Sequence, residues 1–315
     1  MRQQVLVLAG PTACGKTELA LALAERLGAE IVGADSRQIY RGMPIGTAAP
    51  TDEQRARVPH HLVGFLDPQE RYSAARFVND ARRTIAQIHA RGHRAIVVGG
   101  TGFYLRALCG DVALSPAYDP ALRDRLAREA RIHPPEVLHA WLAVRDPMRA
   151  ASVAVSDPYR IVRALEIALV TSGEAAVHPS RGAARSAKGE MEEPTGAEIS
   201  KFEGAKVWLE IDPQELERRI ERRVDAMLRA GFLEEAQRIG ASAVAADAVG
   251  YPHALAYLQG WMTLDELRAL LVRATRRYAK RQRTWFRAEP RVTSVPVGDG
   301  LATLERLARE RLGWA

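Results

Sequence analysis

Short apolar runs alternate with helical patterns over the first hundred residues of the chain. The runs at 5–9, 31–34 and 95–98 consist of apolar residues and glycine and have the length of buried strands. Between them, residues 18–27 and 76–91 place apolar side chains at helical spacing, and a glycine follows each stretch. Strands that alternate with helices predict an α/β fold in which helices flank a parallel, doubly wound sheet. The loops after the three strands would then lie at one edge of the sheet, where open α/β sheets bind ligands.

The pattern becomes purely helical in the middle of the chain. Residues 111–171 contain short amphipathic segments separated by prolines, which predicts an inserted helical subdomain. Residues 172–204 are rich in glycine, alanine, serine and glutamate and predict a flexible loop. A strand at 207–211 and helices at 213–239 and 264–287 follow. We therefore expect a core domain made of residues 1–110 and 205–315, interrupted by the helical subdomain and the loop.

Composition narrows the class of protein. The chain has 315 residues, of which 47% are apolar and 26% are charged, enough for one large domain that carries a smaller one. Its start shows no secretory leader and no apolar run approaches membrane-spanning length, so a cytoplasmic protein with no membrane partner is expected. Two cysteines, Cys14 and Cys109, supply neither a disulfide framework nor a zinc site. A net charge of +7 favours a polyanionic partner, and a monomer is the default expectation.

The stretch directly after the first strand has the pattern of a phosphate-binding loop (P-loop), G-x-x-x-x-G-K-[ST]. Its residues are Gly10, Pro11, Thr12, Ala13, Cys14, Gly15, Lys16 and Thr17. Glycines let the backbone fold around an anion, so that N–H groups and the positive end of the next helix converge on phosphate oxygens. Lys16 would add a point charge, and the Thr17 hydroxyl would hold Mg²⁺. The sequence therefore predicts a site for a diphosphate or triphosphate, with Mg²⁺ as cofactor.

A second signal is the density of cations near the C-terminus. Between residues 273 and 287 the chain carries seven, namely Arg273, Arg276, Arg277, Lys280, Arg281, Arg283 and Arg287. Tyr278, Trp285 and Phe286 lie among them. Cations neutralise backbone phosphates and aromatic rings stack on unpaired bases, so the segment is typical of RNA contact. The alternative is a solvated helix face whose aromatic side chains belong to the core.

Asp35, directly after the second predicted strand, has two interpretations. In a P-loop protein such a carboxylate is either a Mg²⁺ ligand or a general base aimed at the group that attacks the bound phosphate ester. Asp35 opens a polar loop at 35–40, which suits the binding of a second substrate. The residues alone leave both roles open.

Several blocks of the sequence together resemble the tRNA dimethylallyltransferases. They are GPTACGKT at 10–17, ADSRQIYRGMPIGTA at 34–48, HHLVGFLDP at 60–68, VGGTGFY at 98–104, DPYRIVRALE at 157–166 and KRQRTWFR at 280–287. The blocks are spread over most of the chain, in order. The resemblance implies that dimethylallyl diphosphate, and not ATP, occupies the P-loop. It also implies transfer of the dimethylallyl group to N6 of the adenosine immediately 3′ of the anticodon in tRNA, with release of diphosphate.

The matching positions carry implied roles. Asp35, Thr101 and Arg223 would be catalytic, with Asp35 as the base that accepts a proton from N6. Arg219 would bind the diphosphate together with residues 10–17. The implied tRNA contacts are Asp35, Ser36, Arg37, Gln38, Thr101, Arg123, Tyr159, Arg160, Arg163, Lys280, Arg281, Arg283, Trp285 and Arg287. Where the family usually carries a cation for the RNA, residues 250–253 read GYPH, so the match implies no such contact there.

Three other classes of protein share part of this pattern. A small-molecule kinase would use the same loop for ATP but would not need the basic segment at 273–287. A nucleic-acid-dependent NTPase would need an acidic residue on another strand, and residues 97–100 contain none. An adenylate prenyltransferase would share the chemistry but not the RNA.

Overall fold

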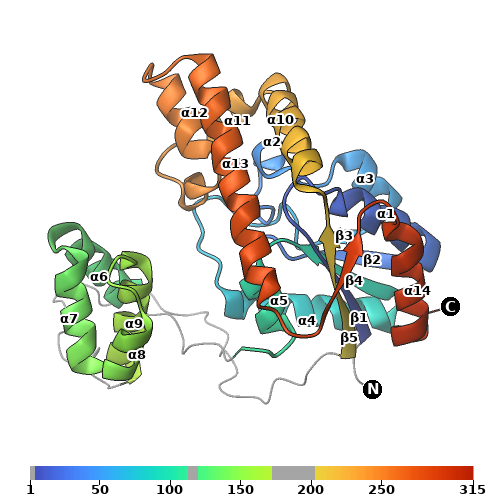
Figure 1. Cartoon of the computed structure of the whole chain (residues 1–315), viewed down its shortest axis with the longest axis horizontal. Helices are drawn as coiled ribbons and strands as arrows, with labels where there is room; N and C mark the ends of the chain where they lie inside the picture. Colours follow the sequence, from blue (N-terminus) through green and yellow to red (C-terminus); the bar gives the residue numbers. More distant parts are fainter. Residues whose placement is uncertain (1–3, 113–119, 172–202, 315) are drawn as a thin grey trace, which may run out of the picture. The chain divides into compact units, whose positions relative to one another are not determined.

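The computed structural model describes residues 4–112, 120–171 and 203–314 (Figure 1). Contacts divide the chain into two compact units, one made of Met1–Val112 and Glu198–Ala315 and the other of Ala113–Ala197. The first unit contains the sheet, and the described part of the second, residues 120–171, contains helices. Of the predicted flexible loop, residues 172–202 lie outside the described residues, and the last two positions, 203 and 204, begin a strand.

Six strands of the first unit form one parallel sheet. They are β1 (Gln4–Ala9), β2 (Ala29–Gly33), β3 (His60–His61), β4 (Arg94–Gly99), β5 (Glu203–Glu210) and β6 (Val292–Pro296). Their order is β3-β2-β4-β1-β5-β6, so β1 lies between β4 and β5. This is the α/β fold that the alternation of strands and helices predicts. The pattern misses the edge strands β3 and β6, which are short or only partly buried and so carry a weak apolar signal.

Helices cover both faces of the sheet and its carboxyl end (Figure 1). One face carries α1 (Lys16–Leu27) and α14 (Gly300–Leu312), and the other carries α4 (Ala74–Ala90) with α5 (Gly102–Leu108) packed beside it. Beyond the carboxyl ends of the strands lie α10 (Pro213–Arg229), α11 (Phe232–Ile239), α12 (Tyr251–Leu258) and the first part of α13 (Leu264–Arg287), whose C-terminal end lies beside α5. The short helices α2 (Pro44–Thr47) and α3 (Asp52–Arg57) belong to the connection that follows β2 in the sequence and leads to β3. Throughout the described ranges, no helix has the length and apolar content needed to cross a bilayer.

A single apolar cluster joins the helices at the carboxyl end to the loop after β2. Ile39 and Met43 of that loop are buried against Ile220 of α10 and Leu271 of α13. Burial of such side chains contributes roughly 1.5–3 kcal/mol each, so the cluster holds α10 and α13 over the loops that carry the candidate site. The helix predicted over 213–239 is wrong at one point, because Gly231 takes a φ of +94° and separates α10 from α11.

Within its described residues, 120–171, the second unit is a group of four helices. They are α6 (Pro120–Ile132), α7 (Pro135–Arg145), α8 (Pro147–Ser152) and α9 (Pro158–Thr171). Each begins at a proline, which suits the first turn of a helix because the missing N–H has no intrahelical acceptor there. Leu126, Leu138, Leu142 and Leu165 form part of the buried core of this unit.

Candidate functional site

The P-loop at 10–17 connects β1 to α1. Ala13, with a φ of +65°, and Gly15, with a φ of +93°, both take left-handed conformations. Gly10 permits the loop to fold closely on itself, because a Cβ there would come within 2.7 Å of Cys14 Sγ. Burial raises the pKa of the Cys14 thiol, so this side chain is a neutral packing group. Since α1 begins at Lys16, the N–H groups of its first turn lack intrahelical acceptors and are available to an anion.

Two arginines of α10 reach this loop. Arg219 Nη1 donates to the Cys14 carbonyl at 2.9 Å, and Arg223 Nη1 donates to the Thr12 hydroxyl at 2.8 Å. Both guanidinium groups lie on one face of the helix, as their spacing of four residues predicts. Burial lowers the pKa of Arg223, and the nearby Asp35 carboxylate opposes that shift. The pair places two cations at the edge of the anion site.

Asp35 follows β2 and lies at the same edge of the sheet. Its Oδ1 accepts hydrogen bonds from the backbone N–H groups of Arg37, at 2.9 Å, and Gln38, at 3.4 Å. Within the described chain, its Oδ2 accepts no hydrogen bond. Thr101 steadies the same loop, since its Oγ1 accepts a hydrogen bond from the Ser36 N–H at 3.0 Å. One carboxylate oxygen therefore orients the side chain, and the other is free for a proton or a cation.

The side chains of Arg37 and Gln38 already have partners in the protein. Arg37 Nη1 lies 2.7 Å from an oxygen of Asp247, and Gln38 Nε2 donates to the carbonyls of Thr47 and Ala48. These bonds shape the wall beside Asp35. Direct recognition of RNA by either side chain stays a prediction.

Two cavities meet at Asp35. The donor-side cavity, of about 380 Å³, is lined by the P-loop and by the face of α10 that carries the two arginines. The acceptor-side cavity, of about 240 Å³, is lined by the loop after β2 and by α13. Both cavities have Thr12, Asp35, Thr47 and Arg223 in their walls. An anion in the donor-side cavity and a nucleobase in the acceptor-side cavity would therefore both adjoin the Asp35 carboxylate and the Arg223 guanidinium.

Oxygen donors that suit Mg²⁺ line the donor-side cavity. They are the Thr17 hydroxyl and the Asp35 carboxylate. Mg²⁺ usually takes one or two protein oxygens and completes its shell with substrate phosphates and water, so this donor set fits the ion. Among residues 4–112, 120–171 and 203–314, no group of three or more His, Cys, Asp or Glu side chains is arranged to hold a metal. Binding of Mg²⁺ here would thus depend on phosphate oxygens of the substrate.

The cations of α13 divide between two sides of the helix. The side facing the two cavities carries Tyr278, Arg281 and Gln282. Another side carries Lys280, Arg283 and Arg287, which line a groove between α10 and α13. Helical periodicity explains the division, because residues separated by three or four positions lie on the same side of a helix. The basic segment is therefore not the single surface that its cation density suggests.

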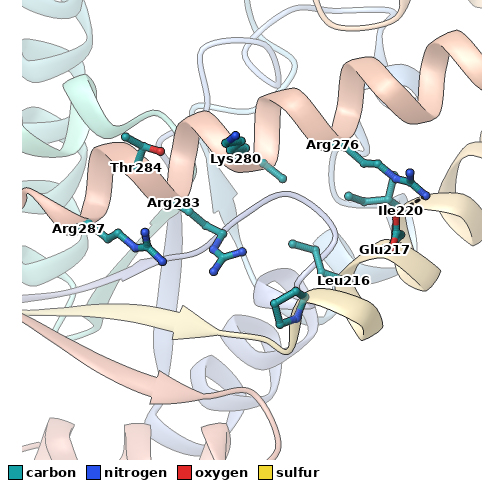
Figure 2. Close-up of a pocket in the computed structure, with 10 residues that line it drawn as sticks. Leu216, Glu217, Ile220, Arg276, Lys280, Arg283, Thr284 and Arg287 are labelled. Atoms are coloured by element: carbon teal, nitrogen blue, oxygen red, sulfur yellow. Dashed lines mark ion pairs between the residues drawn. The ribbon is translucent and has the colours of Figure 1, made fainter.

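The groove between α10 and α13 has a volume of about 370 Å³. Figure 2 shows Arg283 and Arg287 extending from α13 toward the α10 side, and Arg276 paired with Glu217. Arg276 is neutralised by Glu217 and Glu221, at 2.6 and 2.7 Å. The other three basic side chains of the groove form no ion pair with any described residue. Unpaired cations along a helix suit the phosphodiester backbone of a nucleic acid.

The aromatic side chains of α13 differ in their surroundings. Phe286 is buried, and Trp285 packs so closely on Gly102 that a Cβ there would come within 2.2 Å of the ring. The Arg106 guanidinium lies 4.2 Å from the centroid of the Trp285 ring. Tyr278 lines the acceptor-side cavity instead. Tyr278 is therefore better placed than Trp285 to contact a nucleobase of the RNA. The role of Trp285 as a tRNA contact stays a prediction.

The remaining implied tRNA contacts fall in the second unit. Arg123 and Arg163 both pair with Glu166, at 3.7 and 2.7 Å, and the Glu166 side chain is 1% exposed. Tyr159 and Arg160 are exposed in the first turn of α9. Arg160 pairs with Asp157 at 3.4 Å. Three of the four side chains thus have an ion-pair partner inside their own unit, and all four stay predictions as RNA contacts.

Sequence reasoning overlooks two residues that the structure places at the site. Thr47 lines both cavities, and Gln282 forms hydrogen bonds with Thr12 of the P-loop and with Gly100. Thr47 has no signal beyond its place in the block at 34–48. Gln282 has a weak one, since it is a neutral side chain within a run of cations.

Comparisons with known proteins agree over the whole chain. A family model described as IPP transferase matches residues 38–289, and one described as isopentenyl transferase matches residues 3–59. The tRNA dimethylallyltransferase of Geobacter sulfurreducens is 40% identical over 99% of this chain and 98% of its own length. That of Anaeromyxobacter dehalogenans is 43% identical over 97% of this chain and 99% of its own.

Solved structures show the same relationship. The full-length tRNA isopentenylpyrophosphate transferase of Bacillus halodurans is 32% identical, with a TM-score of 0.69 over 99% of this chain and 98% of that one. A eukaryotic dimethylallyltransferase acting on tRNA is 25% identical, with a TM-score of 0.74 over 98% of this chain and 78% of that one. The family matches, the sequence identities and the shared fold together confirm the resemblance seen in the sequence blocks: the chain belongs to the IPP transferase family.

Proposed function

We propose that this chain transfers a dimethylallyl group from dimethylallyl diphosphate to N6 of the adenosine immediately 3′ of the anticodon in tRNA, and releases diphosphate. The observation that carries the proposal is the meeting of two cavities at Asp35 and Arg223. Transfer between two substrates needs such an arrangement, because donor and acceptor must be held in contact at their reacting atoms. The names of the curated relatives support the same reaction.

In this proposal the diphosphate of the donor occupies the donor-side cavity. Lys16, Arg219 and the N–H groups of the P-loop lie where they would offset its charge. That charge grows on the leaving oxygen as the allylic C–O bond breaks, so fixed cations stabilise the transition state more than the bound substrate. Mg²⁺ held by the Thr17 hydroxyl and phosphate oxygens would supply further positive charge.

The adenine of the acceptor occupies the acceptor-side cavity, with N6 directed at Asp35. The N6 lone pair is conjugated with the ring, so N6 is a poor nucleophile until it loses a proton. As the new C–N bond forms, Asp35 Oδ2 accepts that proton, and the electron pair of the C–O bond leaves with diphosphate. To reach this cavity the base must leave its stack in the anticodon loop.

The rest of the proposal concerns partners and location. The tRNA would contact the exposed cations of α13, since a net charge of +7 favours a polyanion. A monomer suffices, because one chain supplies the P-loop, the Asp35 loop and both arginines. The free, buried thiols of Cys14 and Cys109 agree with the reducing conditions of the cytoplasm, where tRNA is found.

A transfer assay tests the proposal. The protein is incubated with dimethylallyl diphosphate labelled in its allyl group or with γ-labelled ATP, and with unmodified tRNA or AMP as acceptor. We expect allyl label in tRNA, competition by inorganic diphosphate, and no RNA-stimulated ATP hydrolysis, because residues 97–100 supply no acidic group for that reaction. A tRNA with guanosine in place of the target adenosine is the matched control. Label on AMP, or phosphate transfer from ATP, would contradict the proposal in favour of an adenylate prenyltransferase or a kinase.

A salt titration tests the RNA surface. Replacing Lys280, Arg281 and Arg287 together with glutamine should weaken tRNA binding and reduce the slope of log K against log salt by roughly one to three, because each lost phosphate contact removes about one released counterion. Arg276→Gln is the matched control, since Glu217 and Glu221 already neutralise that cation. If the triple variant kept the wild-type slope, these three cations of α13 would be solvated and would not contact RNA.

A further inference from the structure

One neutral side chain in the basic segment of α13 joins two loops of the site. Gln282 is 5% exposed. Its Oε1 accepts a hydrogen bond from the Thr12 N–H at 2.8 Å, and its Nε2 donates to the Gly100 carbonyl at 3.0 Å. The fit is close, because a Cβ at Gly100 would come within 2.1 Å of Nε2. The amide therefore spans the gap between the P-loop and the loop after β4 with one donor and one acceptor.

Each of the two loops leads directly to groups of the proposed reaction. On one side, Thr12 is bonded through its hydroxyl to Arg223, which lies between the cavities. On the other side, Gly100 precedes Thr101, whose hydroxyl is bonded to the Ser36 N–H beside Asp35. The bonds to Gln282 therefore connect the wall that would hold the leaving group with the loop that carries the base.

A glutamine is suited to this place because its side chain offers both a donor and an acceptor at a fixed separation. Both bonded backbone groups are neutral, so the connection needs no charge in the buried space between the loops. A cation at the same position, like its neighbours Arg281 and Arg283, could not accept the Thr12 N–H.

We propose that Gln282, which lines the donor-side cavity, is a positioning residue for the transfer: its two hydrogen bonds to the backbone set the spacing between the diphosphate-binding loop and the loop of Asp35. The inference rests on the proposed function. Reaction rates depend steeply on the placement of reacting groups, and a displacement of about 1 Å can cost about 10²-fold. The effect of losing the connection should therefore appear in kcat more than in KM.

The first test removes both hydrogen bonds. Gln282→Met keeps the length and flexibility of the side chain but can neither donate nor accept as an amide does. We expect kcat to fall about 10–100-fold while the KM for dimethylallyl diphosphate and the Kd for tRNA change less than about threefold. Gln87→Met, the same replacement at an exposed position of α4, is the matched control. A folded Gln282→Met with wild-type kcat, or a loss confined to KM, would overturn the inference.

The second test restores one hydrogen bond by protonation. Gln282→Glu keeps an acceptor for Thr12, but its carboxylate has no proton to donate to Gly100 until it is neutralised, which burial favours. The ratio of the variant's kcat to that of the wild type should therefore rise by roughly tenfold as pH falls from about 8 to about 6. Dividing the two kcat values cancels the pH dependence of any group that titrates in the same way in both proteins.

If Gln282→Glu melts at the same temperature as the wild type and its kcat relative to the wild type does not change with pH, the inference is contradicted. This test holds even if Gln282→Met fails to fold. Failure of the proposed function gives a different result. If the wild-type chain transfers no allyl label to tRNA, both proposals fall, whereas an active wild type with equally active Gln282 variants removes the positioning role alone.

Discussion

Asp35→Ala lowers the rate of dimethylallyl transfer by about 10²–10⁴, the usual contribution of a positioned general base. The affinity for tRNA should stay nearly unchanged, because one carboxylate adds little to binding that phosphate contacts dominate. The structure favours this outcome, since Oδ1 is used to orient the side chain and Oδ2 is free. Single-turnover transfer with the protein in excess, together with tRNA binding at fixed salt, measures the two quantities separately.

Thr17→Ala serves as the comparison variant, because both side chains line the donor-side cavity. It removes a proposed Mg²⁺ ligand and leaves the base in place, so its activity should recover as Mg²⁺ is raised. The rate of Asp35→Ala should not recover. If both variants respond to Mg²⁺ in the same way, Asp35 is a metal ligand and its assignment as the base is wrong.

The second large effect is expected at Arg223. Arg223→Gln should lower kcat by about 10²–10³, because it removes a preorganised cation beside the bond that breaks. Arg223 also holds the Thr12 hydroxyl, so part of the loss reflects the position of the P-loop. Steady-state kinetics with dimethylallyl diphosphate and tRNA give kcat and KM for each substrate.

Arg218→Gln is the matched control, since that arginine lies on the same helix, is exposed and pairs with Glu215. Equal rates for the two variants would exclude a role for Arg223 in the transition state. The double variant Asp35→Ala with Arg223→Gln adds a second check. Because the charges of the two groups interact, their losses in ΔG‡ should not be additive.

Much of the fold and part of the site can be predicted from local sequence. The P-loop is readable because all its chemistry lies in eight consecutive residues, and its glycines mark the conformations that the backbone must take. The strands β1, β2 and β4 are readable because burial on both faces makes them continuous apolar runs. Short or partly exposed strands such as β3 and β6 lack that signal.

The site as a whole depends on contacts between distant parts of the chain. Asp35 adjoins Arg223 because the sheet order and the packing of α10 bring them together across 188 positions of sequence, and no local pattern records that distance. The basic segment shows the same limit. Its composition predicts cations, but the packing of α13 against the P-loop and α10 decides which of them face the cavities and which line the groove.

By itself, the sequence determined the α/β class, the phosphate-binding loop and the family. Each of these is recognised from short contiguous segments, or from the order in which such segments follow one another along the chain. The tertiary structure alone decided that Asp35, Arg223 and Thr12 border two cavities at once, and that Gln282 joins the loops on either side. The physical reason is that these properties come from hydrogen bonds and packing between elements far apart in the chain. Such contacts exist once the elements have assembled, whereas propensity and periodicity act within one element at a time.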